Sequence, residues 1–239
     1  IVLTGSCASS NEKTLVLAQQ HPDIFSCTAG LHPHHASEWS PAFDTRQREL
    51  LQHPTVVAVG ECGLDYNRDF SPRAVQRHAF AQQLQVAVDC SKPLFLHERE
   101  AHSDFIAQLK EVMPQVSNAV VHCFTGNADE INAYLELGCY IGITGWVCDE
   151  RRNHALLTAL QHAPRELLLQ RVMIETDAPY LLPRTLPRRL RDKQHPHRCE
   201  PSYLPFVLQG LAHALTVDET LLTQHCLDNS HRFFNLQPA

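Results

Sequence analysis

Four short apolar runs in the sequence each lead into a side chain that can bind a metal ion. The four residues are Glu61, His97, His122 and Asp177, and stretches of Val, Ile, Leu or similar residues precede them. Carboxylate oxygens and imidazole nitrogens together suit Mg²⁺, Mn²⁺ or Zn²⁺, and ligand type alone does not choose among these ions. A bound cation can lower the pKa of a water molecule and stabilise charge on a phosphate. We therefore predict a hydrolytic site with one or two divalent metal ions, in which Glu61 is the natural bridge.

A purely structural reading of these residues is also open. A single histidine is often partly buried and satisfied by neighbouring hydrogen bonds. A carboxylate at a buried strand end is costly unless it is paired or bound to a metal. Four such residues at four strand ends favour the metal site.

Asp177 and several residues outside this set could take part in the reaction. Asp177 could act as the general base instead of a ligand, because a carboxylate beside a metal can accept a proton from water. Glu175 should point to the same side of its strand as Asp177. His32 ends another apolar run, and Pro33 holds it in extended geometry. We expect His32 to contact the scissile phosphate or to protonate the leaving oxygen, whereas His34 and His35 fit a surface loop better. Asp65 is a weaker candidate on a loop.

Basic and aromatic side chains near these residues could hold a substrate. Arg99 could pair with a phosphate through its planar guanidinium, or form a salt bridge with a neighbouring glutamate. The basic segment from Arg184 to Arg198 follows the run that leads to Asp177, and could hold a nucleic-acid backbone without sequence preference. The stacking candidates for unpaired bases are Trp146, Tyr180 and Tyr203, although core packing is the more common use of such residues.

The elements that must position these residues alternate between strand and helix. The predicted strands are Ile1–Thr4, Phe25–Gly30, Thr55–Gly60, Pro93–Leu96, Ala119–Val121, Tyr140–Thr144 and Val172–Glu175. Helical patterns lie between them, for example Ala74–Asp89 and Asp129–Leu137. Uninterrupted apolar runs indicate parallel strands buried on both faces. Landmarks at the strand ends recur at intervals of 23 to 36 residues, close to the unit length of a β/α barrel.

This pattern predicts an α/β fold, a TIM-type (β/α)8 barrel of the metal-dependent hydrolase class. A doubly wound sheet also alternates strand and helix, but the Gly-rich phosphate fingerprint of dinucleotide folds is absent. Only seven strands can be counted, and the chain opens inside an apolar run. The simplest expectation is that the first βα unit is missing. We predict a single domain over residues 1–239.

Composition narrows the setting of the protein. The net charge of −6 argues against broad attraction to nucleic acid, so a polyanion would have to be held locally by metal and a basic loop. No apolar stretch approaches the roughly 20 residues that span a bilayer. Nine scattered cysteines without a CxxC pair indicate a reducing compartment, and we expect a cytoplasmic monomer.

Several motifs in order resemble the TatD family of metal-dependent deoxyribonucleases. They are Ala29–His34 (AGLHPH), Gly60–Asp65 (GECGLD), His97–Arg99 (HER), His122–Gly126 (HCFTG), Tyr140–Arg152 (YIGITGWVCDERR) and Glu175–Leu181 (ETDAPYL). The resemblance runs over essentially the whole chain. It implies a magnesium-dependent 3′→5′ exonuclease on single-stranded DNA and RNA, with a role in DNA repair.

The sequence departs from the family pattern at two places. The Asp-x-His-x-His motif of the family's first strand is absent, which puts part of a second metal shell in doubt. Cys199 stands where the family's Arg-x-Glu-Pro segment usually has Asn. Two other functions stay open: an amidohydrolase-type enzyme acting on a small ester or amide, because fold does not fix substrate, and a non-catalytic binding derivative.

Overall fold

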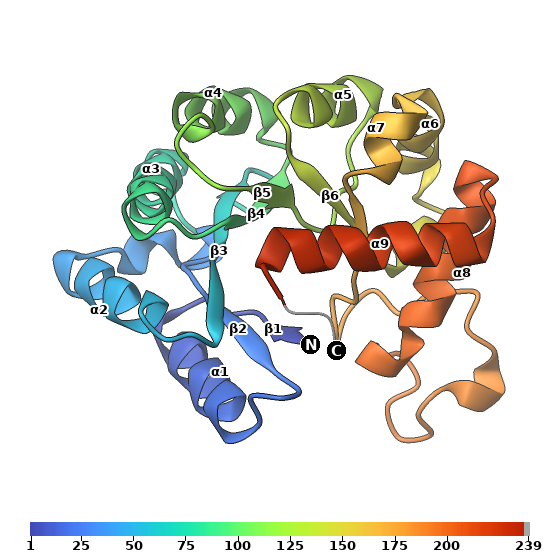
Figure 1. Cartoon of the computed structure of the whole chain (residues 1–239), viewed down its shortest axis with the longest axis horizontal. Helices are drawn as coiled ribbons and strands as arrows, with labels where there is room; N and C mark the ends of the chain where they lie inside the picture. Colours follow the sequence, from blue (N-terminus) through green and yellow to red (C-terminus); the bar gives the residue numbers. More distant parts are fainter. Residues whose placement is uncertain (237–239) are drawn as a thin grey trace. The chain divides into compact units, whose positions relative to one another are not determined.

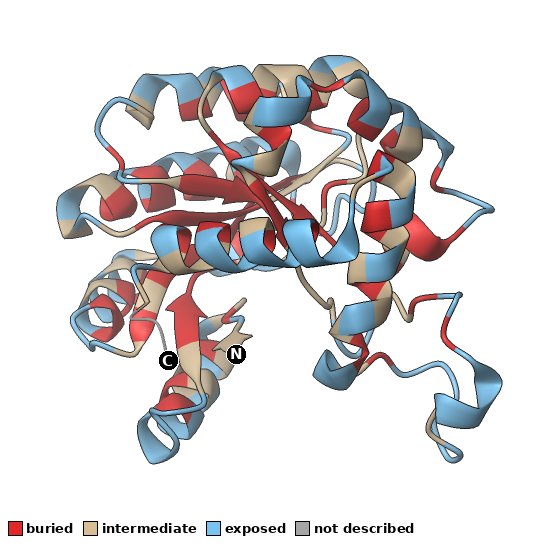
Figure 2. Cartoon of the chain, turned by 45° about the vertical axis from the view of Figure 1, so that its right-hand side comes forward, coloured by how far each residue is buried: buried red, intermediate tan, exposed pale blue. Residues whose placement is uncertain are grey.

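The apolar runs form strands, and most residues of the strands after the first are buried, whereas both residues of the first strand are partly exposed (Figure 2). In the computed structural model, which describes residues 1–236, the strands are β1 (Val2–Leu3), β2 (Ser26–Ala29), β3 (Val56–Asp65), β4 (Leu94–Arg99), β5 (Ala119–Val121), β6 (Tyr140–Ile143) and β7 (Val172–Ile174). The α-helices are α1 (Ala8–Gln20), α2 (Pro41–Leu51), α3 (Arg73–Cys90), α4 (His102–Val112), α5 (Ala128–Glu136), α6 (His154–His162), α7 (Arg165–Leu169), α8 (Leu204–Leu215) and α9 (Glu219–Phe234). Strand and helix alternate as predicted, so the α/β class is confirmed.

The chain forms two compact units, and each is described by itself. The first comprises Ile1–Val120 with Phe233–Asn235. Its strands follow one another in the order β1-β2-β3-β4-β5, and the pairs from β1 to β4 are parallel. Helices α1, α2 and α3 pack along one side of these strands (Figure 1). Parallel order brings the carboxyl ends of β2, β3 and β4 to the same edge of this sheet.

The second unit comprises Val121–Arg232 and, within the described residues, Leu236. Its strands β6 and β7 pair in parallel from Ile141 opposite Val172 to Ile143 opposite Ile174. Helices α5, α6 and α8 pack in this unit, where α6 contacts both of the others. The prediction of one domain over residues 1–239 stays a prediction, and residues 237–239 lie outside the described part.

Two strands extend further than the sequence pattern indicated. β3 continues to Asp65 and β4 to Arg99, whereas the apolar runs end at Gly60 and Leu96. The register of β3 against β4 shifts between Val59 and Cys62, and Gly60 has φ +142°. This glycine carries β3 through an irregularity, after which pairing with β4 resumes. Glu61 and His97 therefore lie inside strands and not just beyond them.

The cysteines are not paired with one another within residues 1–236. All nine cysteines lie in the described part of the chain and are free. Within residues 1–236, no helix combines the length and the apolar character that crossing a bilayer requires.

Candidate active site

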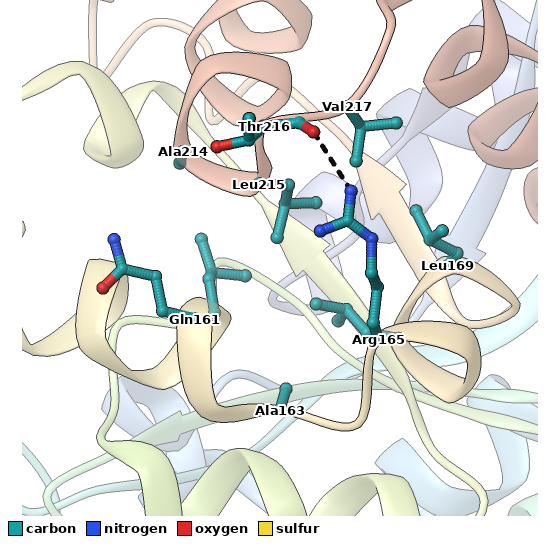
Figure 3. A pocket seen from close by; sticks show the side chains of 10 residues that line it. Gln161, Ala163, Arg165, Leu169, Ala214, Leu215, Thr216 and Val217 are labelled. Carbon is teal, nitrogen blue, oxygen red and sulfur yellow. Dashed lines mark hydrogen bonds between the residues drawn. The ribbon is translucent and has the colours of Figure 1, made fainter.

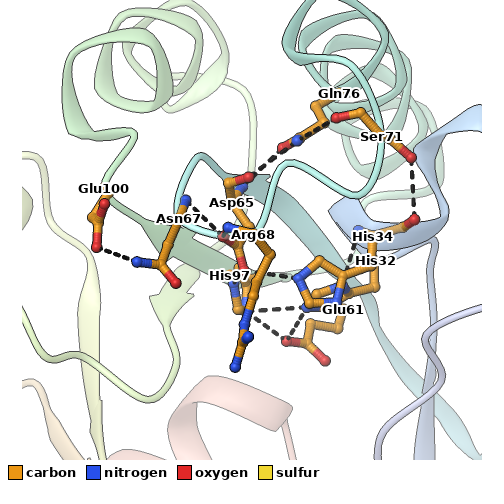
Figure 4. Close-up of polar contacts among 10 residues, drawn as sticks. All are labelled: His32, His34, Glu61, Asp65, Asn67, Arg68, Ser71, Gln76, His97 and Glu100. Atoms are coloured by element: carbon orange, nitrogen blue, oxygen red, sulfur yellow. Dashed lines mark hydrogen bonds and ion pairs between the residues drawn. The ribbon is translucent and has the colours of Figure 1, made fainter.

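Five side chains of the first unit meet at the carboxyl ends of its strands (Figure 4). We call them the histidine–carboxylate cluster; its members are His32, His34, Glu61, Asp65 and His97. His32 follows β2 and precedes a short 3-10 helix, η1 (Pro33–Glu38), which carries His34. Glu61 and Asp65 come from β3, and His97 from β4.

The inner part of the cluster has the spacing of a metal-ligand set. The Glu61 Oε1 atom lies 3.0 Å from His97 Nδ1 and 3.4 Å from His32 Nε2, and these two nitrogens are 3.2 Å apart. Two atoms that each bind a metal at about 2.1 Å lie roughly 3.0 to 3.4 Å apart in octahedral or tetrahedral geometry. Oxygen and imidazole donors suit Mg²⁺, Mn²⁺ or Zn²⁺, so this group could hold a divalent cation.

The outer contact of His97 fixes which ring nitrogen faces this group. His97 Nε2 lies 3.4 Å from the carboxylate of Asp65, which is almost fully buried with 1% of its side chain exposed. In the tautomer that carries the His97 proton on Nε2, toward Asp65, the lone pair of Nδ1 lies beside Glu61 Oε1 and could bind a cation there. A carboxylate behind a histidine in this way orients a metal ligand and raises its basicity.

His32 has the opposite arrangement of protons. The backbone N–H of His34 donates to His32 Nδ1 over 3.1 Å. The neutral His32 ring therefore carries its proton on Nε2, the nitrogen that faces Glu61 and His97. In this tautomer Nε2 can donate to a phosphate oxygen, and it would ligate a metal only after losing that proton. The local geometry thus separates His32, a donor, from Glu61 and His97, which are acceptors.

Asp65 is held in its ionised form. Burial opposes ionisation, but hydrogen bonds from His97, from the backbone N–H of Arg68 and from His34 outweigh it and hold the pKa of Asp65 well below its usual range. The His34 Nε2–Asp65 distance is 2.8 Å. Our prediction that Asp65 lies on a loop is wrong, because it is the last residue of β3 and pairs opposite Arg99. His34 belongs to the cluster, whereas His35 is exposed and pairs with Glu38.

Buried amides on the helices fix the backbone that carries the cluster, and the sequence analysis missed them. Gln83 of α3 accepts from Leu31 N over 2.7 Å and donates to Leu31 O over 3.0 Å. Gln76 of α3 makes the same pair of bonds with the backbone of Asp65, at 2.8 and 3.0 Å. Each amide satisfies a buried donor and acceptor where a strand ends. The available signal was a glutamine on the apolar face of a predicted helix.

The residues predicted on later strands lie in the second unit. His122 directly follows β5, and its Nδ1 lies 3.4 Å from Glu175 Oε1. The backbone N–H of Cys123 also donates to Glu175. Asp177 follows β7 and is partly buried. Burial raises the pKa of the Cys123 thiol to about 12, and the charges of Asp177 and Glu175 add to the effect. His122 and the two carboxylates are thus electrostatic neighbours of the same thiol.

The predicted substrate-binding arginines differ in their surroundings. Arg99 is partly exposed and forms no ion pair with any residue in the range 1–236, so neither neighbouring glutamate is its partner. Arg184 lies 3.3 Å from Glu150, and Arg198 lies 2.8 Å from Glu200. The Arg184–Glu150 pair is exposed and the Arg198–Glu200 pair is partly exposed, and ion pairs in contact with solvent are weak enough to exchange for other anions.

The three aromatic candidates for base stacking, all in the second unit, differ in exposure and contacts. Tyr203 is buried and its hydroxyl donates to Leu190 O over 3.0 Å, so core packing explains it. Arg152 covers the ring of Trp146 at 4.2 Å from its centroid. Tyr180 is exposed. Cys199 is buried in a small apolar cluster, and its backbone N–H donates to Pro179 O.

A cavity elsewhere in the second unit offers less chemistry. It lies between the end of α6, α7 and the end of α8 (Figure 3). Its lining is largely aliphatic, and the single charged side chain, Arg165, donates to Thr216 O over 3.1 Å. Because Arg165 is the only charged side chain among the described residues of this cavity and is already hydrogen-bonded, the cavity has no carboxylate or histidine that could activate water.

A parallel α/β chain whose strands carry histidine and carboxylate donors has the arrangement of a metal-dependent hydrolase of the TIM-barrel type. The family model described as "TatD related DNase" matches residues 1–235. The chain belongs to the TatD-related DNase family. A curated relative from Pectobacterium parmentieri, named "3'-5' ssDNA/RNA exonuclease TatD", is 45% identical over 236 residues, which cover 99% of this chain and 88% of that protein.

Two solved structures confirm the fold class. A TatD family hydrolase from Entamoeba histolytica has a TM-score of 0.87 at 24% identity, covering 99% of this chain and 85% of that one. A TatD homologue from Escherichia coli has a TM-score of 0.86 at 25% identity, covering 99% and 86%. The TIM-type α/β fold is therefore confirmed. Residues 1–236 contain seven strands, one fewer than the eight of a closed barrel.

Proposed function

We propose that this chain is a metal-dependent nuclease that hydrolyses phosphodiester bonds of single-stranded DNA and RNA from the 3′ end. One observation carries the proposal: Glu61 and His97 Nδ1, 3.0 Å apart on paired strands, present metal-type donors within a TatD-related chain. The name of the Pectobacterium relative supports the substrate and the polarity, since that protein is 45% identical over 99% of this chain.

The assignment of roles follows from the donors and acceptors. Glu61 and His97 would hold a divalent cation, which we propose to be Mg²⁺, with Mn²⁺ and Zn²⁺ as alternatives and one or two ions bound. Such a cation supplies positive charge to the phosphate and lowers the pKa of a bound water. His32 donates from Nε2 to a phosphate oxygen or to the leaving oxygen. Arg99, whose guanidinium has no anionic partner among residues 1–236, contacts a phosphate.

The sequence analysis also selected residues that lie in the second unit. We assign His122 and Asp177 to metal binding, and Asp177 also to proton transfer from the attacking water as general base. Arg184 and Arg198 contact the nucleic-acid backbone, and the exposure of their ion pairs supports this role. A cytoplasmic location belongs to the same proposal, and nine free thiols support a reducing compartment.

The test uses single-stranded DNA labelled at its 5′ end, with Mg²⁺ or Mn²⁺. We expect progressive shortening from the 3′ end that EDTA stops. Glu61→Gln should lower the rate about 100-fold or more and weaken metal binding in calorimetry, because it removes an anionic ligand. Glu49→Gln, at an exposed glutamate on α2, is the matched control and should behave like the wild type. Intact DNA in a sample that binds metal, or full activity of Glu61→Gln, would refute the proposal.

A further inference from the structure

The loop between β3 and α3 carries two exposed side chains to which no role has yet been assigned. They are Arg68 and Phe70, three and five residues after Asp65. The loop itself is well anchored: Asp65 Oδ1 accepts from the backbone N–H groups of Asn67 and Arg68, each over 2.9 Å. On the other side, Ser71 donates to His34 O over 3.1 Å. Both anchors belong to the histidine–carboxylate cluster.

Phe70 extends the aromatic surface of the cluster into solvent. Its ring centroid is 4.7 Å from that of His34, and the two rings are inclined by 66°. The His34 ring in turn lies 4.2 Å from the His32 ring. Phe70 nevertheless remains 68% exposed, and it is the one aromatic among the strongly exposed large apolar residues of the first unit. A phenyl ring held in this way has a free surface one histidine away from the predicted phosphate contact.

Arg68 is unusual among the arginines of the first unit. Six arginines lie in residues 1–120, and four of them form ion pairs with carboxylates: Arg46, Arg48, Arg73 and Arg77. Arg68 has no such pair with any residue up to position 236, and it is exposed. Figure 4 shows its side chain running from the end of β3 in the direction of His97 and Glu61. An arginine without an ion pair, on a loop anchored to the cluster, is suited to bind a phosphate group.

We propose that Arg68 and Phe70 form a nucleotide subsite beside the cluster, in which Phe70 stacks against an unpaired base and Arg68 pairs with the adjoining backbone phosphate. This inference rests on the proposed nuclease function and adds the part of the substrate that the cluster does not contact. Stacking needs an open base face, which a single strand offers and a duplex conceals. The subsite therefore favours single-stranded substrate without reading its sequence.

The first measurement is binding without turnover. A single-stranded oligonucleotide containing 2-aminopurine is titrated in EDTA, and stacking is followed as quenching of its fluorescence. Phe70→Leu should remove the quenching and weaken binding about 5- to 150-fold, the effect of losing one base–aromatic stack. Phe70→Trp should retain both the quenching and the binding affinity of the wild type, because tryptophan also stacks on a base. Unchanged quenching in Phe70→Leu overturns the subsite, whatever the outcome for hydrolysis.

The second measurement compares two substrates with Mg²⁺. On an ordinary oligonucleotide, Phe70→Leu should raise KM with little change in kcat, whereas on one with abasic 3′ nucleotides it should have no effect. Arg68→Gln should raise KM on both substrates. It should also reduce the slope of log K for binding against log salt concentration by about the contribution of one phosphate contact. Arg77→Gln, at a paired arginine of α3, is its control. Equal effects of Phe70→Leu on both substrates overturn the stacking role. Quenching without any cleavage by the wild type would refute the nuclease function and leave the subsite standing.

Discussion

Replacing Gln83 by leucine tests whether a buried amide holds the backbone that carries His32. The side chain is 1% exposed, and it accepts from Leu31 N over 2.7 Å and donates to Leu31 O over 3.0 Å. Leucine fills a similar volume but leaves both backbone groups buried without these partners. Each buried unsatisfied group costs about 1–3 kcal/mol, so we expect the free energy of unfolding to fall by about 2–6 kcal/mol. That is a large part of the roughly 5–15 kcal/mol that stabilises a typical protein.

The assay is thermal unfolding followed by circular dichroism, together with nuclease activity. A loss of about 3 kcal/mol should lower Tm by about 6–12 °C in a chain of this length. Gln82→Leu makes the same substitution at the neighbouring exposed position of α3 and should change stability by less than about 0.5 kcal/mol. Activity below Tm should also fall in Gln83→Leu, because His32 follows Leu31. Equal stability of the two variants would refute the reasoning.

Two further predictions concern β3 and a thiol. Gly63→Ala should destabilise the protein by at least about 3 kcal/mol in urea unfolding, because φ is +149° and a Cβ would lie 1.8 Å from His97 O; a loss under about 1 kcal/mol would contradict this. Cys7 should be alkylated much faster than Cys27 at pH 7.5 in peptide mapping by mass spectrometry. Partial burial raises the pKa of Cys7, but its hydrogen bonds with the side chains of Ser10 and Ser9 outweigh burial and lower that pKa to about 7, whereas burial raises the pKa of Cys27 to about 11. The thiolate fraction of Cys7 should therefore rise through pH 7, and an inflection near pH 9 would show that the hydroxyls have no effect.

Much of the architecture could be predicted because strand burial leaves a direct mark on composition. Strands covered on both faces have no polar alternation, and all seven predicted strands are present within a few residues of their expected bounds. The predicted bounds of β3 and β4 end too early. Polar residues such as Glu61 and His97 interrupt the apolar run, but the backbone pairing of the two strands continues past them. Hydrogen-bonded register is a property of two strands together, and one strand's composition does not reveal it.

The residues of the candidate site could be predicted only in part from the sequence. Residue type and position after an apolar run selected Glu61 and His97, which lie within hydrogen-bonding distance of each other. The sequence pattern places Asp65 on a loop and His34 in a surface loop, and so gives both little weight. Their importance comes from a contact across 31 residues of sequence, at 2.8 Å, which no local pattern encodes.

The sequence by itself determined the alternation of strand and helix, the kind of donor at each strand end and the family to which the chain belongs. All three can be inferred from the order of residue types, because buried strands are apolar and metal ligands belong to a few residue types. Tertiary structure alone decided which groups contact each ring nitrogen of His32 and His97, and the favoured tautomer of each ring depends on those contacts. It also decided which arginines are already neutralised and left Arg68 and Phe70 free at the edge of the cluster. Pairing and exposure depend on neighbours in space, and the folded chain supplies those neighbours from distant parts of the sequence.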